Sequence, residues 1–92
     1  MKLKIGSHSY DVIFKNLDDE AQPNSGYCNT TGNKITINNT LPISQQESTI
    51  VHEIIEAINF LYQLDLEHNK IMTLETALYQ ILKDNYKINL IK

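Results

Sequence analysis

Three ionisable side chains interrupt the most apolar segment of the chain. His52, Glu53 and Glu56 lie among isoleucine, valine and alanine residues over positions 50–58. A segment that is apolar on nearly every side is normally a buried helix, and ionisable groups inside one are costly unless something pairs with them. His52 and Glu56 are four residues apart, so about 40° separates them around a helix axis and they share a face. The pattern predicts a polar site on a buried helix.

The sequence His-Glu-x-x-Glu over positions 52–56 differs at its last residue from a metal-binding motif. His-Glu-x-x-His on a helix binds zinc through its two histidines, and its glutamate activates a bound water molecule. Eighteen residues separate Glu56 from Glu75, which lies on the next predicted helix. This spacing resembles that of the gluzincin metallopeptidases. The resemblance implies that His52, Glu56 and Glu75 are metal ligands and that Glu53 is the general base.

Most of the chain resembles the very small zincin-like, metallopeptidase-like proteins that bacteriophages and prophages encode. The resemblance is specific over positions 52–58, where that family has His-Glu-Ile-Ile-His-Ala-Ile, and over Leu-Tyr-Gln-Ile-Leu-Lys-Asp-Asn at 78–85. It implies a peptidase that acts on a peptide or a host protein in the cytoplasm of a bacterial host cell. It also implies an edge strand, at 26–30 or 34–38, that aligns an extended peptide beside the active helix.

Glu56 in place of a second histidine changes the chemistry that we expect. One histidine with two carboxylates is an oxygen-rich ligand set, which favours Mn²⁺ or another oxygen-preferring ion and makes bound water less acidic. We therefore expect a single divalent ion, Zn²⁺ or Mn²⁺, and weak or degenerate peptidase activity. Three alternatives stay open. One is a metal-free network in which His52 bonds Glu56 or Glu75. The second is a non-catalytic binding module that engages a host protein on a metal-free zincin scaffold, and the third is a structural homo-oligomer that pairs through its sheet edge.

Four further residues carry weaker predictions. Tyr79 follows Glu75 by one turn, where its hydroxyl could donate to a transition-state oxyanion or to a carboxylate that supports the metal ligands. The alternative is a core residue with its hydroxyl at the rim. Glu53 could face solvent instead of acting as a base. Asn59 could support the metal ligands, but the preferred prediction is a polar residue on a helix flank. His68 is predicted only to begin a helix, because its spacing from His52 fits no metal-binding pattern.

The sequence predicts strands in the first part of the chain and helices in the second, and these elements must position the side chains above. Alternating apolar residues predict strands at 2–5, 9–14, 26–30 and 34–38. Periodicity predicts helices from about 45 to 62 and from about 68 to 85, and Ser44 with Glu47 has the spacing of a capping box. The short connection between the helices predicts antiparallel packing. We expect a single α+β domain over 1–92, with a small antiparallel sheet of three or four strands followed by two packed helices.

The composition limits the classes of function. The chain has 92 residues and a net charge of −3, and all eight of its positive residues are lysines. The lack of arginine and of a basic patch argues against nucleic-acid binding. The single Cys28 can form neither an internal disulfide nor a cysteine-based zinc site. Neither a signal peptide nor a membrane span is evident, so we expect an intracellular protein without a membrane partner, and the oligomeric state is not predicted.

Overall fold

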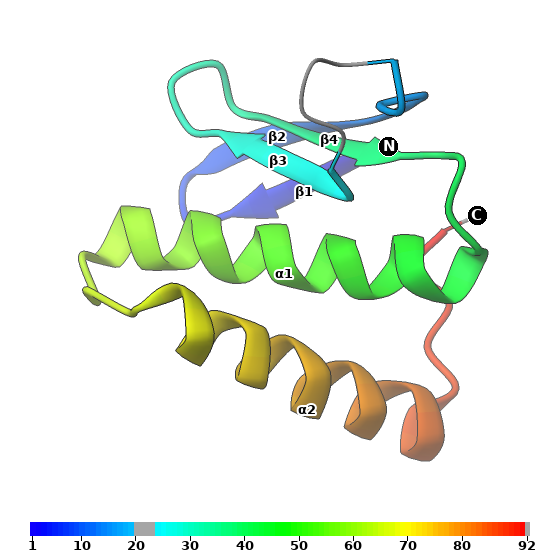
Figure 1. The fold of residues 1–92 in the computed structure, drawn as a ribbon. Helices are drawn as coiled ribbons and strands as arrows, with labels where there is room; N and C mark the ends of the chain where they lie inside the picture. The colour runs from blue at the N-terminus through cyan, green and yellow to red at the C-terminus, as the bar shows by residue number, and fades with distance from the viewer. Residues whose placement is uncertain (20–23, 92) are drawn as a thin grey trace.

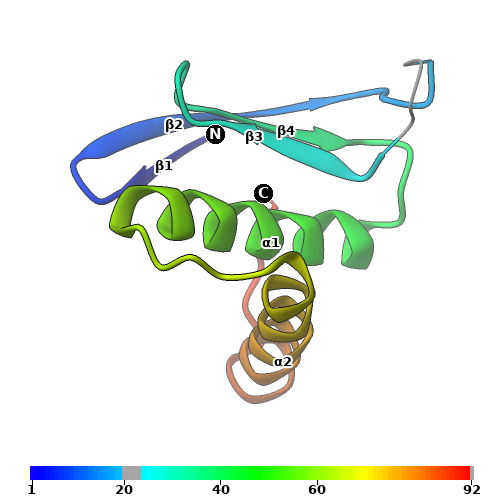
Figure 2. The same ribbon diagram turned by 60° about the vertical axis from the view of Figure 1, so that its left-hand side comes forward.

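The computed structural model describes residues 1–19 and 24–91. Four strands precede two helices, in the order that the sequence predicted. The strands are β1 (Lys2–Ile5), β2 (His8–Lys15), β3 (Gly26–Asn29) and β4 (Lys34–Asn38). The helices are α1 (Ile43–Tyr62) and α2 (His68–Tyr86). The sheet, α1 and α2 form three successive layers, with α1 in the middle (Figures 1 and 2).

The strands form one mixed sheet in the order β1-β2-β4-β3. The β1–β2 and β3–β4 pairs are antiparallel, and the β2–β4 pair is parallel. The predicted α+β class is confirmed, but the sheet is not wholly antiparallel. The parallel pair arises because β3 takes the outer position and β4 then returns between β3 and β2. In the described part of the chain β3 is therefore an edge strand and β4 is not, which decides between the two candidate edges.

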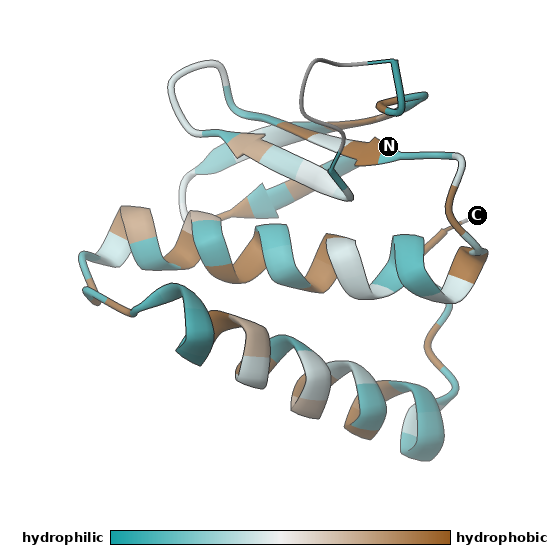
Figure 3. Cartoon of the chain, viewed as in Figure 1, coloured by the Kyte–Doolittle hydropathy of each residue, from teal (hydrophilic) through white to brown (hydrophobic). Residues whose placement is uncertain are grey.

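Apolar residues on opposite sides of α1 hold the three layers together. Between the sheet and α1, the buried residues are Ile5, Tyr10, Val12, Ile35, Ile37, Ile50 and Ala57. Between α1 and α2 they are Val51, Ile55 and Ile71. Because α1 has neighbours on both sides, it carries apolar residues around most of its circumference, as Figure 3 shows by the recurring hydrophobic patches along its length. No helix in the described residues is long and apolar enough to cross a bilayer.

The start of α1 differs from the sequence prediction. Pro42 is the N-cap residue and makes no side-chain capping bond, so Ser44 lies inside the first turn and the predicted capping box is wrong. Glu47, the other half of that box, is 1% exposed. Its Oε1 accepts hydrogen bonds from the Tyr79 hydroxyl at 2.8 Å and Lys83 Nζ at 3.0 Å, and its Oε2 accepts one from the Leu90 backbone at 2.9 Å. Glu47 thus ties α1 to α2 and to the C-terminal segment.

The connection between the helices determines where α2 begins. Gln63 and Asp65 adopt left-handed conformations, with φ of 52° and 57°. The Asn59 side chain holds the turn, because its Oδ1 accepts a hydrogen bond from Leu66 N at 2.9 Å and its Nδ2 donates to Leu66 O at 3.4 Å. The chain then reverses, and α2 runs back beneath α1 (Figure 1). Asn59 is therefore more than a polar flank residue, since it positions His68 at the start of α2.

Candidate metal centre

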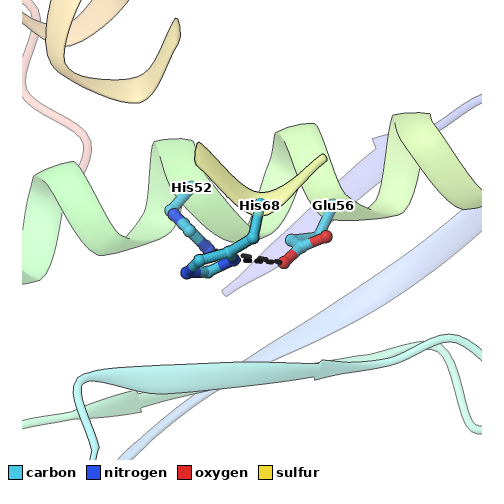
Figure 4. A group of neighbouring side chains, drawn as sticks. All are labelled: His52, Glu56 and His68. Atoms are coloured by element: carbon cyan, nitrogen blue, oxygen red, sulfur yellow. Dashed lines mark ion pairs between the residues drawn. The ribbon is translucent and has the colours of Figure 1, made fainter. Parts of the chain in front are cut away.

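Two histidines and a glutamate meet where α1 and α2 come together (Figure 4). His52 Nε2 lies 3.4 Å from Glu56 Oε2, and His68 Nδ1 lies 3.9 Å from the same oxygen. The two imidazole centroids are 5.3 Å apart. One potential ligand atom from each residue lies within 4.8 Å of the others, and this is the group in the described residues that could hold a metal ion.

The spacing of these atoms fits a small divalent ion. Ligand atoms about 2.0–2.1 Å from a tetrahedral zinc lie about 3.4 Å from one another. The separation between His52 Nε2 and Glu56 Oε2 equals that value. The His68 side chain is 68% exposed, so its ring is free to turn and shorten the longer separation. Two imidazoles and one carboxylate are a ligand set that catalytic zinc sites use.

Glu75 contacts His52 but is not part of the group formed with Glu56 and His68, so its role as a metal ligand stays a prediction. Its Oε1 lies 2.8 Å from His52 Nδ1, whereas Glu56 is beside Nε2 of the same ring. The two ring nitrogens point in diverging directions, so Glu75 and Glu56 lie on opposite sides of the imidazole. A carboxylate on Nδ1 fixes the tautomer and the orientation of a histidine and leaves Nε2 available to a metal. The third side chain of the group is His68, where the sequence prediction placed Glu75.

Glu53 is buried beside this group. Its exposure is 5%, which excludes the alternative that it faces solvent. Burial raises the pKa of Glu53 to about 7, with His52 opposing the rise and the carboxylates Glu56 and Glu75 adding to it. A carboxyl group whose pKa is close to neutral pH is well matched to accept and return a proton. The general-base role of Glu53 stays a prediction.

The Tyr79 hydroxyl makes its hydrogen bond outside the His52 group. It donates to Glu47 Oε1, and the ring packs against the cluster between α1 and α2. Burial, together with the hydrogen bond to Glu47 and the charge on that residue, raises the pKa of Tyr79 to about 12. This placement matches the packing role that the sequence left open for Tyr79. The catalytic role predicted for it stays a prediction.

Two pockets adjoin the His52 group. The first has a volume of about 420 Å³ and extends towards the start of α1, where Gln45 and Thr49 line it. The second has a volume of about 430 Å³ and extends towards the end of α1, where Phe60 lines it. Residues common to the two linings are Gly26, His52, Glu53 and His68. Together the pockets form a groove between α1 and β3, with the candidate metal centre at its middle.

The edge strand β3 lies very close to α1 at this groove. A Cβ atom at Gly26 would be 2.8 Å from Thr49 Cγ2 and 2.6 Å from the Thr36 carbonyl, so a larger residue would not fit without a shift. Asn38 N donates to the Ser25 carbonyl at 2.8 Å. In an antiparallel ladder the residues that bond the neighbouring strand alternate with residues that face away. The backbone groups of Gly26 and Cys28 are therefore directed away from β4, towards the open edge.

The Cys28 thiol, which also lines the groove, is not an activated nucleophile. Burial raises its pKa to about 11, and the nearby carboxylates of Glu53 and Glu56 contribute to the rise. The thiolate, not the thiol, is the reactive form. Chemistry in the groove is thus expected from the histidines and glutamates.

No protein-family model matches the chain, and no match was found among curated proteins or solved structures. The resemblance to zincin-like phage proteins therefore stays a prediction, and function has to be inferred from the site.

Proposed function

We propose that the protein is a zincin-like, metal-dependent peptidase with weak activity on extended peptides. Support comes from one arrangement: potential ligand atoms of His52, Glu56 and His68 converge at the middle of a groove whose wall contains the buried Glu53. The ligand set favours Zn²⁺ over Mn²⁺, because it contains two imidazoles and one carboxylate rather than one imidazole and two carboxylates.

Each residue of the site has a distinct task in this proposal. A bound metal supplies positive charge that polarises a peptide carbonyl and makes water more acidic. Glu53 accepts a proton from the attacking water and returns it to the leaving amine. Glu75 holds the His52 ring in place through Nδ1. The outward backbone groups of β3 align the peptide by adding it to the sheet edge.

One feature accounts for weak activity. The Tyr79 hydroxyl already donates to Glu47, so it is not free to stabilise a developing oxyanion, an interaction that is often worth a hundredfold or more in rate.

Metal analysis tests the ligand set directly. Protein purified without chelator is expected to hold about one zinc per chain, and His52→Ala and His68→Ala should each lose it. His8→Ala is the matched control, because His8 begins β2 outside the candidate site. Retention of stoichiometric zinc by His68→Ala would contradict the ligand set.

A second assay separates catalysis from binding. Glu53→Gln should keep the zinc and lose hydrolysis of a fluorogenic peptide library, because the amide cannot accept the proton. Equal hydrolysis by wild type and Glu53→Gln would contradict the role of Glu53.

One feature favours the alternative of a non-catalytic binding module. Leu74, Leu78 and Ile81 recur along α2 with a spacing of four and three residues, and all three are exposed. Such a stripe is typical of a helix that packs against another helix. If a host protein binds this stripe, Leu78→Asp should abolish its capture, while His52→Ala and Glu53→Gln should retain it. Loss of capture in the two site variants would count against this alternative.

A further inference from the structure

The two ends of the groove differ in chemistry. The end near the start of α1 is lined mostly by uncharged polar side chains, among them Gln45, Ser48 and Thr49, together with Met72 of α2. The end near the close of α1 is lined by Tyr27, Cys28, Thr30 and Phe60. Phe60 is 61% exposed and follows Glu56 by one helical turn on the flank that faces the groove. A chain lying in the groove would therefore meet a polar surface on one side of the metal centre and an aromatic one on the other.

The edge strand defines a direction for such a chain. Gly26 lies against Thr49, and Cys28 lines the pocket that Phe60 also lines, so β3 and α1 run the same way along the groove (Figure 1). Antiparallel strand pairing is slightly more stable per residue than parallel pairing. A guest peptide that adds to β3 should thus run from the Phe60 end towards the Thr49 end.

Distances along α1 set the peptide positions that would meet each end. Phe60 is six residues beyond the midpoint of His52 and Glu56, which is about 9 Å along a helix and equals about three residues of extended peptide. Thr49 is five residues before that midpoint, or about two peptide residues in the other direction.

The charges at the centre of the groove exclude one class of side chain. Glu53, Glu56 and Glu75 contribute carboxylates to the two pockets, and no lysine is present among the described residues that line them. Like charges brought together at an interface are strongly unfavourable. In metal-free protein, acidic side chains should therefore be disfavoured at the centre of the groove.

From these observations we propose a sequence preference, which rests on the peptidase function proposed above. The groove selects an extended peptide with a large apolar or aromatic side chain about three residues before the bond at the metal centre, and a small uncharged polar side chain about two residues after it. Phe60 determines the first preference, and the polar side chains of Gln45 and Ser48 determine the second.

Fluorescence anisotropy on zinc-loaded Glu53→Gln protein tests the preference without turnover. The probes are capped, fluorescein-labelled seven-residue alanine peptides. The matched probe has Phe at its second position and Ser at its sixth, and the reversed probe exchanges them. Partial burial of one aromatic side chain predicts about tenfold tighter binding of the matched probe.

Matched variants assign the preference to the two ends. Phe60→Ala should bring the matched and reversed probes to within about twofold of each other. Tyr62→Ala, an aromatic residue of similar exposure on α1 outside both pocket linings, should keep the tenfold difference. Ser48→Asp should improve binding of a probe with Lys at its sixth position about fivefold, whereas Thr73→Asp, which lines neither end of the groove, should not.

Equal affinity for the matched and reversed probes, or tighter binding of the reversed probe, would overturn the proposed preference. A tenfold difference that persists in Phe60→Ala would overturn the assignment to Phe60. Zinc content is measured on the same samples. If zinc is absent, the peptidase proposal fails, while anisotropy on the metal-free protein still decides whether the groove discriminates between the probes.

Discussion

His52 and Glu75 contact each other through Nδ1 and Oε1 at 2.8 Å, across the interface between α1 and α2. The side chains of both are largely buried, at 14% and 20% exposure, so solvent weakens the contact little. The contact directs Nε2 of the same imidazole towards Glu56 and His68. A residue of α2 thereby controls the orientation of a metal-binding residue of α1.

Removal of this contact should weaken metal binding without removing a ligand. We expect Glu75→Gln to lower zinc affinity about 10–100-fold, the usual cost of losing an outer carboxylate partner, measured by competition with a chromophoric chelator. The visible spectrum of the Co²⁺-substituted protein should keep its shape, because the donor atoms are unchanged. Glu67→Gln, at the N-cap of α2, is the control. A changed Co²⁺ spectrum in Glu75→Gln would instead indicate direct ligation, as the sequence pattern predicted.

The sequence pattern predicted that Glu75 lies close to His52. It did not identify His68 as a residue of the site. Antiparallel helices in which position 52 meets position 75 also bring position 68, seven residues back along α2, beside positions 56 to 59. That relation could have pointed to His68. Motif spacing along the chain does not contain that relation, which arises only from the geometry of a helical hairpin. Which nitrogen of His52 meets which carboxylate depends on side-chain rotamers, and these cannot be obtained from spacing.

Tyr79→Phe distinguishes a structural hydroxyl from a catalytic one. Loss of the hydrogen bond to the buried Glu47 should cost about 1–2 kcal/mol in the free energy of unfolding, measured in urea. Peptide hydrolysis under folding conditions should stay within about twofold of wild type, because the hydroxyl is engaged away from the metal centre. A loss of hydrolysis of about a hundredfold with unchanged stability would support the oxyanion role.

The fold was largely predictable, and the role of Glu47 was not. Alternation and helical periodicity placed the strands and helices to within about two residues, because burial on one face imposes those periods on the sequence. Glu47 followed Ser44 at capping-box spacing, yet its partners Tyr79, Lys83 and Leu90 are more than thirty residues away along the chain. A local sequence pattern cannot predict such contacts, because they form only when α2 and the C-terminal segment pack against α1.

Glu47 should increase the free energy of unfolding at pH values where its carboxyl group is ionised. Burial alone would raise the pKa of Glu47, but hydrogen bonds from Leu90, Tyr79 and Lys83 and the charge of Lys83 outweigh it, so the net pKa is lowered. A carboxyl group with a lowered folded pKa stabilises the protein above its unfolded pKa of 4.5, and the stabilisation is lost as the pH falls below that value. Glu47→Gln should therefore destabilise at pH 7 and have little effect near pH 3. Equal destabilisation at both values would contradict this.

Glu53 should have the opposite effect on the pH dependence of stability in metal-free protein. Its folded pKa of about 7 exceeds the ordinary 4.5, so the folded state binds more protons and stability falls as the pH rises from 4.5 to 7. Glu53→Gln keeps the shape without the charge and should be more stable than wild type at pH 8, by up to about 3 kcal/mol. Urea unfolding in EDTA at pH 5, 6.5 and 8 measures this difference. A difference that does not change with pH would show that Glu53 ionises normally.

Gly26→Ala tests whether the close approach of β3 to α1 shapes the groove. The new methyl group would lie 2.6 Å from the Thr36 carbonyl and 2.8 Å from Thr49 Cγ2, so β3 must move away from α1. Overpacking of this kind typically costs about 1–3 kcal/mol in the free energy of unfolding, and we expect peptide affinity to fall by about tenfold or more as the edge shifts. Gly32→Ala is the matched control, because its nearest contact would be the Asn29 side chain at 3.4 Å. Unchanged peptide affinity in Gly26→Ala would mean that the β3 edge does not take part in binding.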